Sequence, residues 1–88
     1  MKLDFVESIH LLCPTDKSYG VKIKNRYLKD VIIKIMEKCS NIKEDKIILR
    51  GEFHGVKIVF FTTTGTLLLL SLKDSGKDVK EILEELLK

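Results

Sequence analysis

The hydrophobic residues of this 88-residue chain change their period along its length, which divides it into strand-like and helix-like segments. Apolar residues tend to alternate with polar ones over residues 5–13, and they alternate strictly over 21–24. Alternation of this kind is typical of strands with one buried face. Pro14 ends the first segment, because proline cannot donate a hydrogen bond inside a sheet. The two segments predict a hairpin.

The spacing becomes helical after Asn25, the predicted N-cap. At 100° per residue one stripe collects Leu28, Val31, Ile32, Ile35 and Cys39. Ser40 and Asn41 are expected to end this first helix. Ile33 lies off the stripe and Met36 at its margin, so we expect a second surface to cover these two residues.

The period falls to two between residues 45 and 72, with turn signals at 54–55 and 64–65. Loops of two residues with glycine second are common in hairpins, because glycine adopts positive φ without strain. Three antiparallel strands follow. If both loops have two residues, Phe53 lies opposite Val56 and Phe61 lies opposite Leu68.

The last of these strands contains four consecutive leucines, 67–70, and is therefore apolar on both faces. Such a strand is typical of a sheet that is covered above and below. Leaving Leu68, Leu70 and Leu72 on the second face in water would forfeit about 1.5–3 kcal/mol each. A second helix is predicted from a capping box at Ser75 and Asp78, and its apolar stripe contains Val79, Ile82, Leu83 and Leu86. We therefore expect one helix on each face.

These elements predict an α/β protein of the α+β type, a single domain over residues 1–88. Its mostly antiparallel sheet has five strands in the order 2-1-5-4-3, and its elements run β-β-α-β-β-β-α. The stretches IILRGEFHGVKIVFF and TLLLLSLKDSGKDVKEILEEL, with Gly51, Gly55 and Gly76, resemble the Roadblock/dynein light chain family. The resemblance extends from about residue 7 to the end. It implies a profilin-like or longin-like fold, here without the family's usual first helix and with a longer first hairpin loop.

The resemblance implies a homodimer joined through the first helix and the edge of the strand at residues 46–53. The strand supports this prediction, because an edge strand with a run of apolar residues and no proline invites pairing. The predicted interface residues are Ile33, Met36, Ile48, Arg50 and Glu52. The predicted function is a non-enzymatic, homodimeric interaction module that regulates or scaffolds a small Ras-like GTPase.

The charges change this interpretation little. The formal net charge of +3 comes from 16 Lys and Arg against 13 Asp and Glu. No basic run exceeds two residues, which argues against a nucleic-acid partner. The alternatives are a structural subunit of a larger complex, or a nucleic-acid-binding module with a TATA-binding-like half-fold. That half-fold would have both helices on one face and the other face free to bind.

Candidate chemistry is sparse. Cys13 and Cys39 are expected to be reduced, buried thiols, and with His10 and His54 they form no convincing metal-ligand spacing. No catalytic constellation and no cofactor motif is recognised, so no enzymatic activity is predicted. The chain has no signal-peptide pattern and no apolar window of the length that a membrane span needs, which predicts a cytoplasmic location. Its many Ile, Lys and Glu residues, without Ala, Gln or Trp, are compatible with a thermophile.

Overall fold

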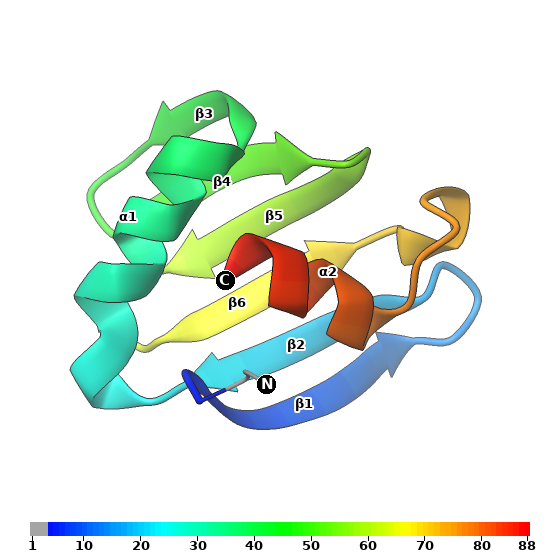
Figure 1. Cartoon of the computed structure of the whole chain (residues 1–88), viewed down its shortest axis with the longest axis horizontal. Coiled ribbons are helices and arrows are strands. Elements are labelled where there is room, and N and C mark those ends of the chain that lie inside the picture. The colour runs from blue at the N-terminus through cyan, green and yellow to red at the C-terminus, as the bar shows by residue number, and fades with distance from the viewer. Residues whose placement is uncertain (1–3) are drawn as a thin grey trace.

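The computed structural model describes residues 4–88 as one antiparallel sheet with two helices, an α+β fold (Figure 1). The strands are β1 (Val6–Cys13), β2 (Ser18–Ile23), β3 (Ser40–Glu44), β4 (Ile48–Phe53), β5 (Val56–Phe61) and β6 (Thr66–Leu70). The helices are α1 (Leu28–Lys38) and α2 (Val79–Leu86), each preceded by a 3-10 turn, at Asn25–Tyr27 and Leu72–Asp74 respectively. The element order is therefore β-β-α-β-β-β-β-α.

The sheet order is β1-β2-β6-β5-β4-β3, so the predicted five-stranded order 2-1-5-4-3 is wrong. The central β6 pairs with β2, and β1 lies at the margin. Burial explains this placement. β2 carries the buried Val21 and Ile23 and the small Gly20, whereas His10 and Leu11 of β1 are exposed. The more apolar strand of the first hairpin therefore occupies the interior of the sheet.

The sixth strand, β3, follows α1 in a segment that was predicted only to end the helix. It pairs with β4, for example Glu44 with Leu49, and an irregularity in the register lies between Ser40 and Lys43. Ile42 is its single apolar residue, so periodicity gave little signal for a strand. Because β3 occupies the outer side of β4, the prediction that residues 46–53 form an edge strand is wrong.

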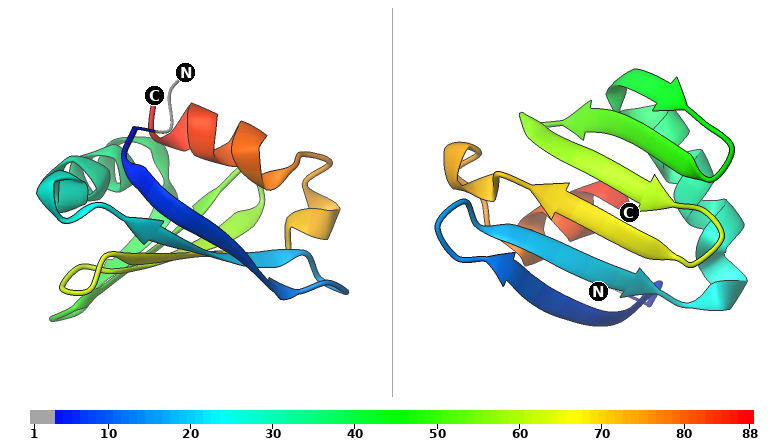
Figure 2. Two further views of the ribbon diagram at one scale, coloured as in Figure 1. Left: turned by 90° about the horizontal axis from the view of Figure 1, so that it is seen from below. Right: turned by 180° about the vertical axis from the view of Figure 1, so that it is seen from behind.

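Both helices pack against the same face of the sheet (Figures 1 and 2), so the prediction of one helix on each face is also wrong. The core between helices and sheet contains Val21, Ile23, Val31, Ile35, Leu49, Val56, Ile58, Phe60, Leu67, Leu69, Leu72, Ile82, Leu83, Leu86 and Leu87. After β6 the chain turns at Ser71, whose φ is 62°, and Leu72 is buried directly afterwards. This turn takes α2 to the side where α1 already lies. The arrangement is the one that the TATA-binding-like alternative required.

The two later hairpins differ in their agreement with the predicted register. Phe53 lies opposite Val56, as predicted. Phe61 lies opposite Thr66 instead of Leu68, because the second loop contains four residues, 62–65, closed by a hydrogen bond from Gly65 N to Phe61 O at 2.9 Å. A shift of two residues leaves every side chain on its predicted face. The predicted division of the three strands into two faces therefore survives this error. It is wrong at Leu72, which was predicted on the face of Leu68 and Leu70 but lies in the core, because β6 ends at Leu70 and the chain turns at Ser71.

The ends of the helices also differ from the prediction. The capping box of α2 joins Asp78 to Glu81: the Glu81 amide donates to Asp78 Oδ1 at 2.9 Å, and the Asp78 amide donates to Glu81 Oε1 at 3.1 Å. The predicted capping box at Ser75 is therefore displaced by one turn. Asn25 opens the 3-10 turn that leads into α1 and does not cap α1 itself.

Candidate functional site

The face of the sheet opposite the helices carries no covering element among residues 4–88 (Figure 2, right). We call it the open sheet face and define it by three rows of cross-strand neighbours. The middle row runs through His10, Gly20, Leu68, Val59, Arg50 and Lys43. The flanking rows are Ser8, Lys22, Thr66, Phe61 and Ile48 on one side, and Leu70, Lys57, Glu52 and Ser40 on the other. Segments far apart in the sequence thus build one continuous surface.

The centre of the open sheet face is apolar. Val59 and Phe61 of β5 and Leu68 and Leu70 of β6 are half-buried by their neighbours in the sheet. Their sequence neighbours point into the core and are 0% exposed: Ile58, Phe60, Leu67 and Leu69. The leucine run is therefore divided between a closed core and a surface that no helix covers. Removing the remaining apolar area from water would be favourable by about 25 cal/mol per Å².

Basic side chains flank this centre. Lys22 lies on the β2 side, and Arg50, Lys57 and Lys43 lie on β4, β5 and β3. Strands are spaced about 4.8 Å apart, so the basic residues span about 19 Å from β2 to β3. The Lys22 amine donates to the Thr64 carbonyl oxygen at the hairpin tip. The surface is thus an apolar strip with cations on both sides.

Two hollows indent the open sheet face. One, of about 540 Å³, lies over β3 to β6 and includes Lys43, Arg50, Lys57 and Leu70 in its lining. The other, of about 390 Å³, lies over β1, β2 and β6. Gly20 forms the floor of the second hollow: a Cβ at this position would lie 3.4 Å from the nearest side-chain carbon of Leu12. The two hollows lie on either side of the apolar centre.

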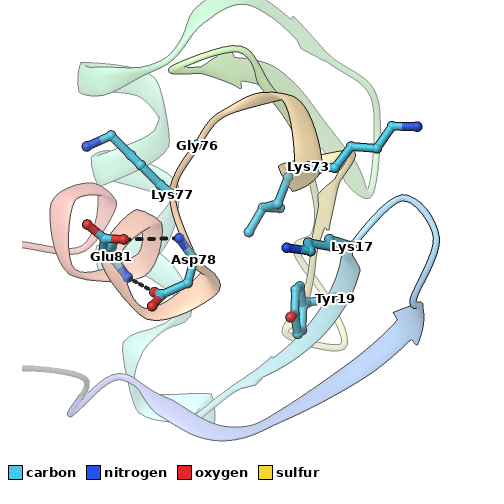
Figure 3. A pocket seen from close by; sticks show the side chains of 8 residues that line it. Lys17, Tyr19, Lys73, Gly76, Lys77, Asp78 and Glu81 are labelled. Carbon is cyan, nitrogen blue, oxygen red and sulfur yellow. Dashed lines mark hydrogen bonds between the residues drawn. The ribbon is translucent and has the colours of Figure 1, made fainter.

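A further cavity of about 360 Å³ lies where the chain enters α2, on the other side of the molecule (Figure 3). Lys17 and Tyr19 face the capping box of Asp78 and Glu81 across it. Those two carboxylates are already hydrogen-bonded to backbone amides, which stabilises the start of the helix. The arrangement therefore serves the local fold and offers no pair of groups poised for acid–base chemistry.

The two other lysines of this cavity have partners elsewhere. Lys73 is 3.5 Å from Asp16 Oδ1, and Lys77 is 3.0 Å from Glu85 Oε2. The hydrogen bond from Lys77 lowers the pKa of the Glu85 carboxyl, and the same contact raises the pKa of Lys77. His54, at the tip of the β4–β5 hairpin, lies 2.9 Å from the other oxygen of Glu85. The two contacts of Glu85 join α2 to the β4–β5 hairpin and to the segment before the helix, whereas the Lys73–Asp16 pair joins the 3-10 turn 72–74 to the β1–β2 loop.

The cysteines and the remaining histidine form no reactive cluster. Burial raises the pKa of the Cys39 thiol to about 11, so at neutral pH it is a protonated, unreactive thiol. Cys13 is also free, and His10 is an exposed residue 3.2 Å from Ser8 Oγ. Over residues 4–88 no three His, Cys, Asp or Glu side chains are grouped as metal ligands. Neither helix in that range is long and apolar enough to cross a membrane.

The structure separates the five residues that were predicted to form a dimer interface. Ile33 and Met36 project from the outer side of α1 and are 53% and 46% exposed. Ile48, Arg50 and Glu52 lie on the open sheet face, on the opposite side of the molecule. The strand pairing that was predicted to join the two groups is blocked, because β3 occupies the edge of β4. Alternation along residues 46–61 puts Arg50, Glu52 and Lys57 on one face, and this mixture of charged residues with apolar ones is a signal in the sequence for an uncovered surface.

Comparison with known protein families, with curated proteins and with solved structures finds no match for this chain.

Proposed function

We propose that the protein is a non-enzymatic binding module that holds a macromolecular partner against the open sheet face. One observation carries the proposal: both helices pack on one side of the sheet, which leaves the apolar centre of the other side without a cover. Antiparallel sheets often have one solvated face, but that face is then normally polar. An uncovered apolar strip with a polar rim is typical of an interaction site.

The shape of the surface favours a macromolecule over a small metabolite. Six strands at about 4.8 Å spacing make the sheet about 24 Å wide. The binding features are distributed over this width, with the apolar strip in the middle and a hollow on each side. Small-molecule sites instead enclose most of the ligand surface in a cleft. A partner that lies across several strands would contact all of these features at once.

A homodimer through α1 is the second candidate, because Ile33 and Met36 are both exposed and lie three positions apart on the helix. Pairing through the edge of β4 is no longer part of this candidate, because β3 occupies that edge. The Ras-like GTPase partner followed from a family arrangement with a helix on each face, which differs from the observed one. We therefore do not retain it in the proposal.

The proposal can be tested with anilinonaphthalene sulfonate, a fluorescent dye that combines an apolar ring system with an anionic group. We expect the folded protein to bind the dye saturably, with amide chemical-shift changes confined to β2, β5 and β6. The variant Val59→Thr/Leu70→Thr should lose this binding and still unfold cooperatively. The matched control Ile33→Thr/Met36→Thr removes exposed apolar residues from α1 and should bind the dye as the unmodified protein does.

The same titration can overturn the proposal. If the dye does not bind the folded protein, or if the α1 control loses binding and the sheet variant keeps it, the open sheet face is not the interaction site. Sedimentation of both variants then distinguishes the second candidate: a dimer through α1 would dissociate in Ile33→Thr/Met36→Thr only.

A further inference from the structure

We infer that the partner of the open sheet face is a nucleic acid, whose phosphates are met by Lys22, Lys43, Arg50 and Lys57. This inference rests on the proposed function, since it names the class of partner for the same surface. It also revises the expectation from the sequence that the basic residues are scattered. They are scattered along the chain, but cross-strand pairing gathers four of them on one face.

The distribution of charge supports this inference. The paired positions of the open sheet face that the structure describes hold four basic side chains and one carboxylate, Glu52. The difference of +3 equals the formal net charge of the whole chain, so the rest of the sequence holds 12 basic and 12 acidic residues. A protein with no net charge elsewhere thus concentrates its excess positive charge on its uncovered face. Such a distribution attracts a polyanion.

Three of the four basic side chains, those of Lys43, Arg50 and Lys57, make no hydrogen bond or salt bridge within residues 4–88, and the Lys22 amine donates to the Thr64 carbonyl oxygen only. None of them takes part in a salt bridge within residues 4–88, where Lys73 and Lys77 have acidic partners. Glu52 lies directly opposite Lys57, and its carboxylate, which also accepts a hydrogen bond from Asn41 at 3.3 Å, keeps its negative charge and offsets one of the four positive charges. Three of the four positive charges on this face therefore have no compensating carboxylate there.

A second copy of the chain fits this surface poorly. Two open sheet faces in contact would bring two groups of positive charge together, and like charges across an interface cost affinity. A nucleic acid supplies both kinds of contact that the face offers. Its phosphates can meet the basic flanks, and its sugars and bases can meet the apolar centre, where Phe61 provides an aromatic ring.

The test measures fluorescence anisotropy of a labelled 20-base-pair DNA duplex and of a single-stranded RNA of 20 nucleotides. Binding through four phosphate contacts predicts a slope of log K against log[salt] of about −3.6 on the duplex. Affinity should then fall about 150-fold between 50 and 200 mM salt. Salt-dependent binding supports the inference if the slope is of this size on the duplex, or about −2.8 on the single-stranded RNA.

Two double variants of equal net charge distinguish the effect of charge on the open sheet face from the effect of the overall charge of the protein. Arg50→Gln/Lys57→Gln removes two cations from the open sheet face, and we expect it to halve the slope. Lys29→Gln/Lys80→Gln removes two exposed cations from α1 and α2, and we expect it to bind as the unmodified protein does. Equal losses of nucleic-acid affinity in the two variants would show that binding depends only on the overall charge, which would overturn the inference.

Unlabelled polyglutamate of 20 residues, added as a competitor to the labelled duplex, tests for an acidic protein partner. If it competes as well as the nucleic acids do, the inference is wrong and an acidic protein is the partner. If no nucleic acid binds but the dye still binds and is lost in Val59→Thr/Leu70→Thr, the open sheet face remains a binding site for another class of partner. If the dye also fails to bind, the proposed function fails together with the inference.

Discussion

Replacing two consecutive leucines of β6 by alanine tests whether the two faces of the sheet differ as the structure shows. Leu69 points into the core and is 0% exposed, whereas Leu68 lies half-buried on the open sheet face. Both residues lie in the same central strand and pair with the same two strands. The comparison therefore holds the strand, its hydrogen bonds and the amino-acid change constant and varies only the face.

The two substitutions should lower the free energy of unfolding by clearly different amounts. Leu69→Ala removes a fully buried side chain and leaves a cavity, which lowers the free energy of unfolding by about 2–5 kcal/mol. At Leu68 solvent fills the space, and one cross-strand neighbour, Gly20, has no side chain to lose contact with. The remaining contact, with Val59, is worth about 0.2–1 kcal/mol. We therefore expect Leu68→Ala to cost about 1 kcal/mol or less.

Urea unfolding followed by circular dichroism measures both values. A domain of this length has a total stability of about 4–13 kcal/mol, so Leu68→Ala should remain folded. At the lower end of this range Leu69→Ala would be unfolded in water, which gives the same ranking of the two variants. A difference of about 2 kcal/mol corresponds to about 8–16 °C in Tm. Equal losses at the two positions would refute the assignment of faces. If the loss at Leu68 also grew with protein concentration, a second copy would be the cover.

Three further predictions concern the supports of the fold. Gly51→Ala should lower the free energy of unfolding by about 1–3 kcal/mol, because the added Cβ would lie 2.9 Å from Cys39 Cβ. In Gly20→Ala the added Cβ would contact only the flexible Leu12 side chain at 3.4 Å, so this control should be nearly neutral in urea unfolding. Lys38→Met should lower the free energy of unfolding by about 1 kcal/mol in the same assay, because the Lys38 amine donates to the Glu85 carbonyl oxygen at 2.7 Å near the end of α2. Lys29→Met is the control. If the two variants lose the same stability, the Lys38 contact is contradicted. Burial raises the pKa of Cys39 from 9.0 to about 11, so the contribution of this thiol to stability is present below pH 9 and is lost as the pH rises toward 11. Over this interval the free energy of unfolding should fall more for the unmodified protein than for Cys39→Ser. Identical pH profiles of the two proteins would refute the assignment.

The amino-acid sequence determined the local elements and the division of residues between faces. Alternation and helical spacing predicted both helices and five of the six strands, and they separated Leu67 and Leu69 from Leu68 and Leu70. Even the wrong loop length in the last hairpin did not disturb this division, because a shift of two residues preserves the face. These features depend on neighbours along the chain, which the sequence contains directly.

The tertiary structure decided which element lies next to which. An apolar strand face has the same pattern whether a helix or a partner covers it, so periodicity could not show that α2 packs beside α1. β3 was missed for a related reason, because a strand with one apolar residue, Ile42, is defined mainly by its pairing with β4. The open sheet face, and the gathering of charge on it, follow from cross-strand neighbours that are distant in sequence. Only the arrangement in space brings them together.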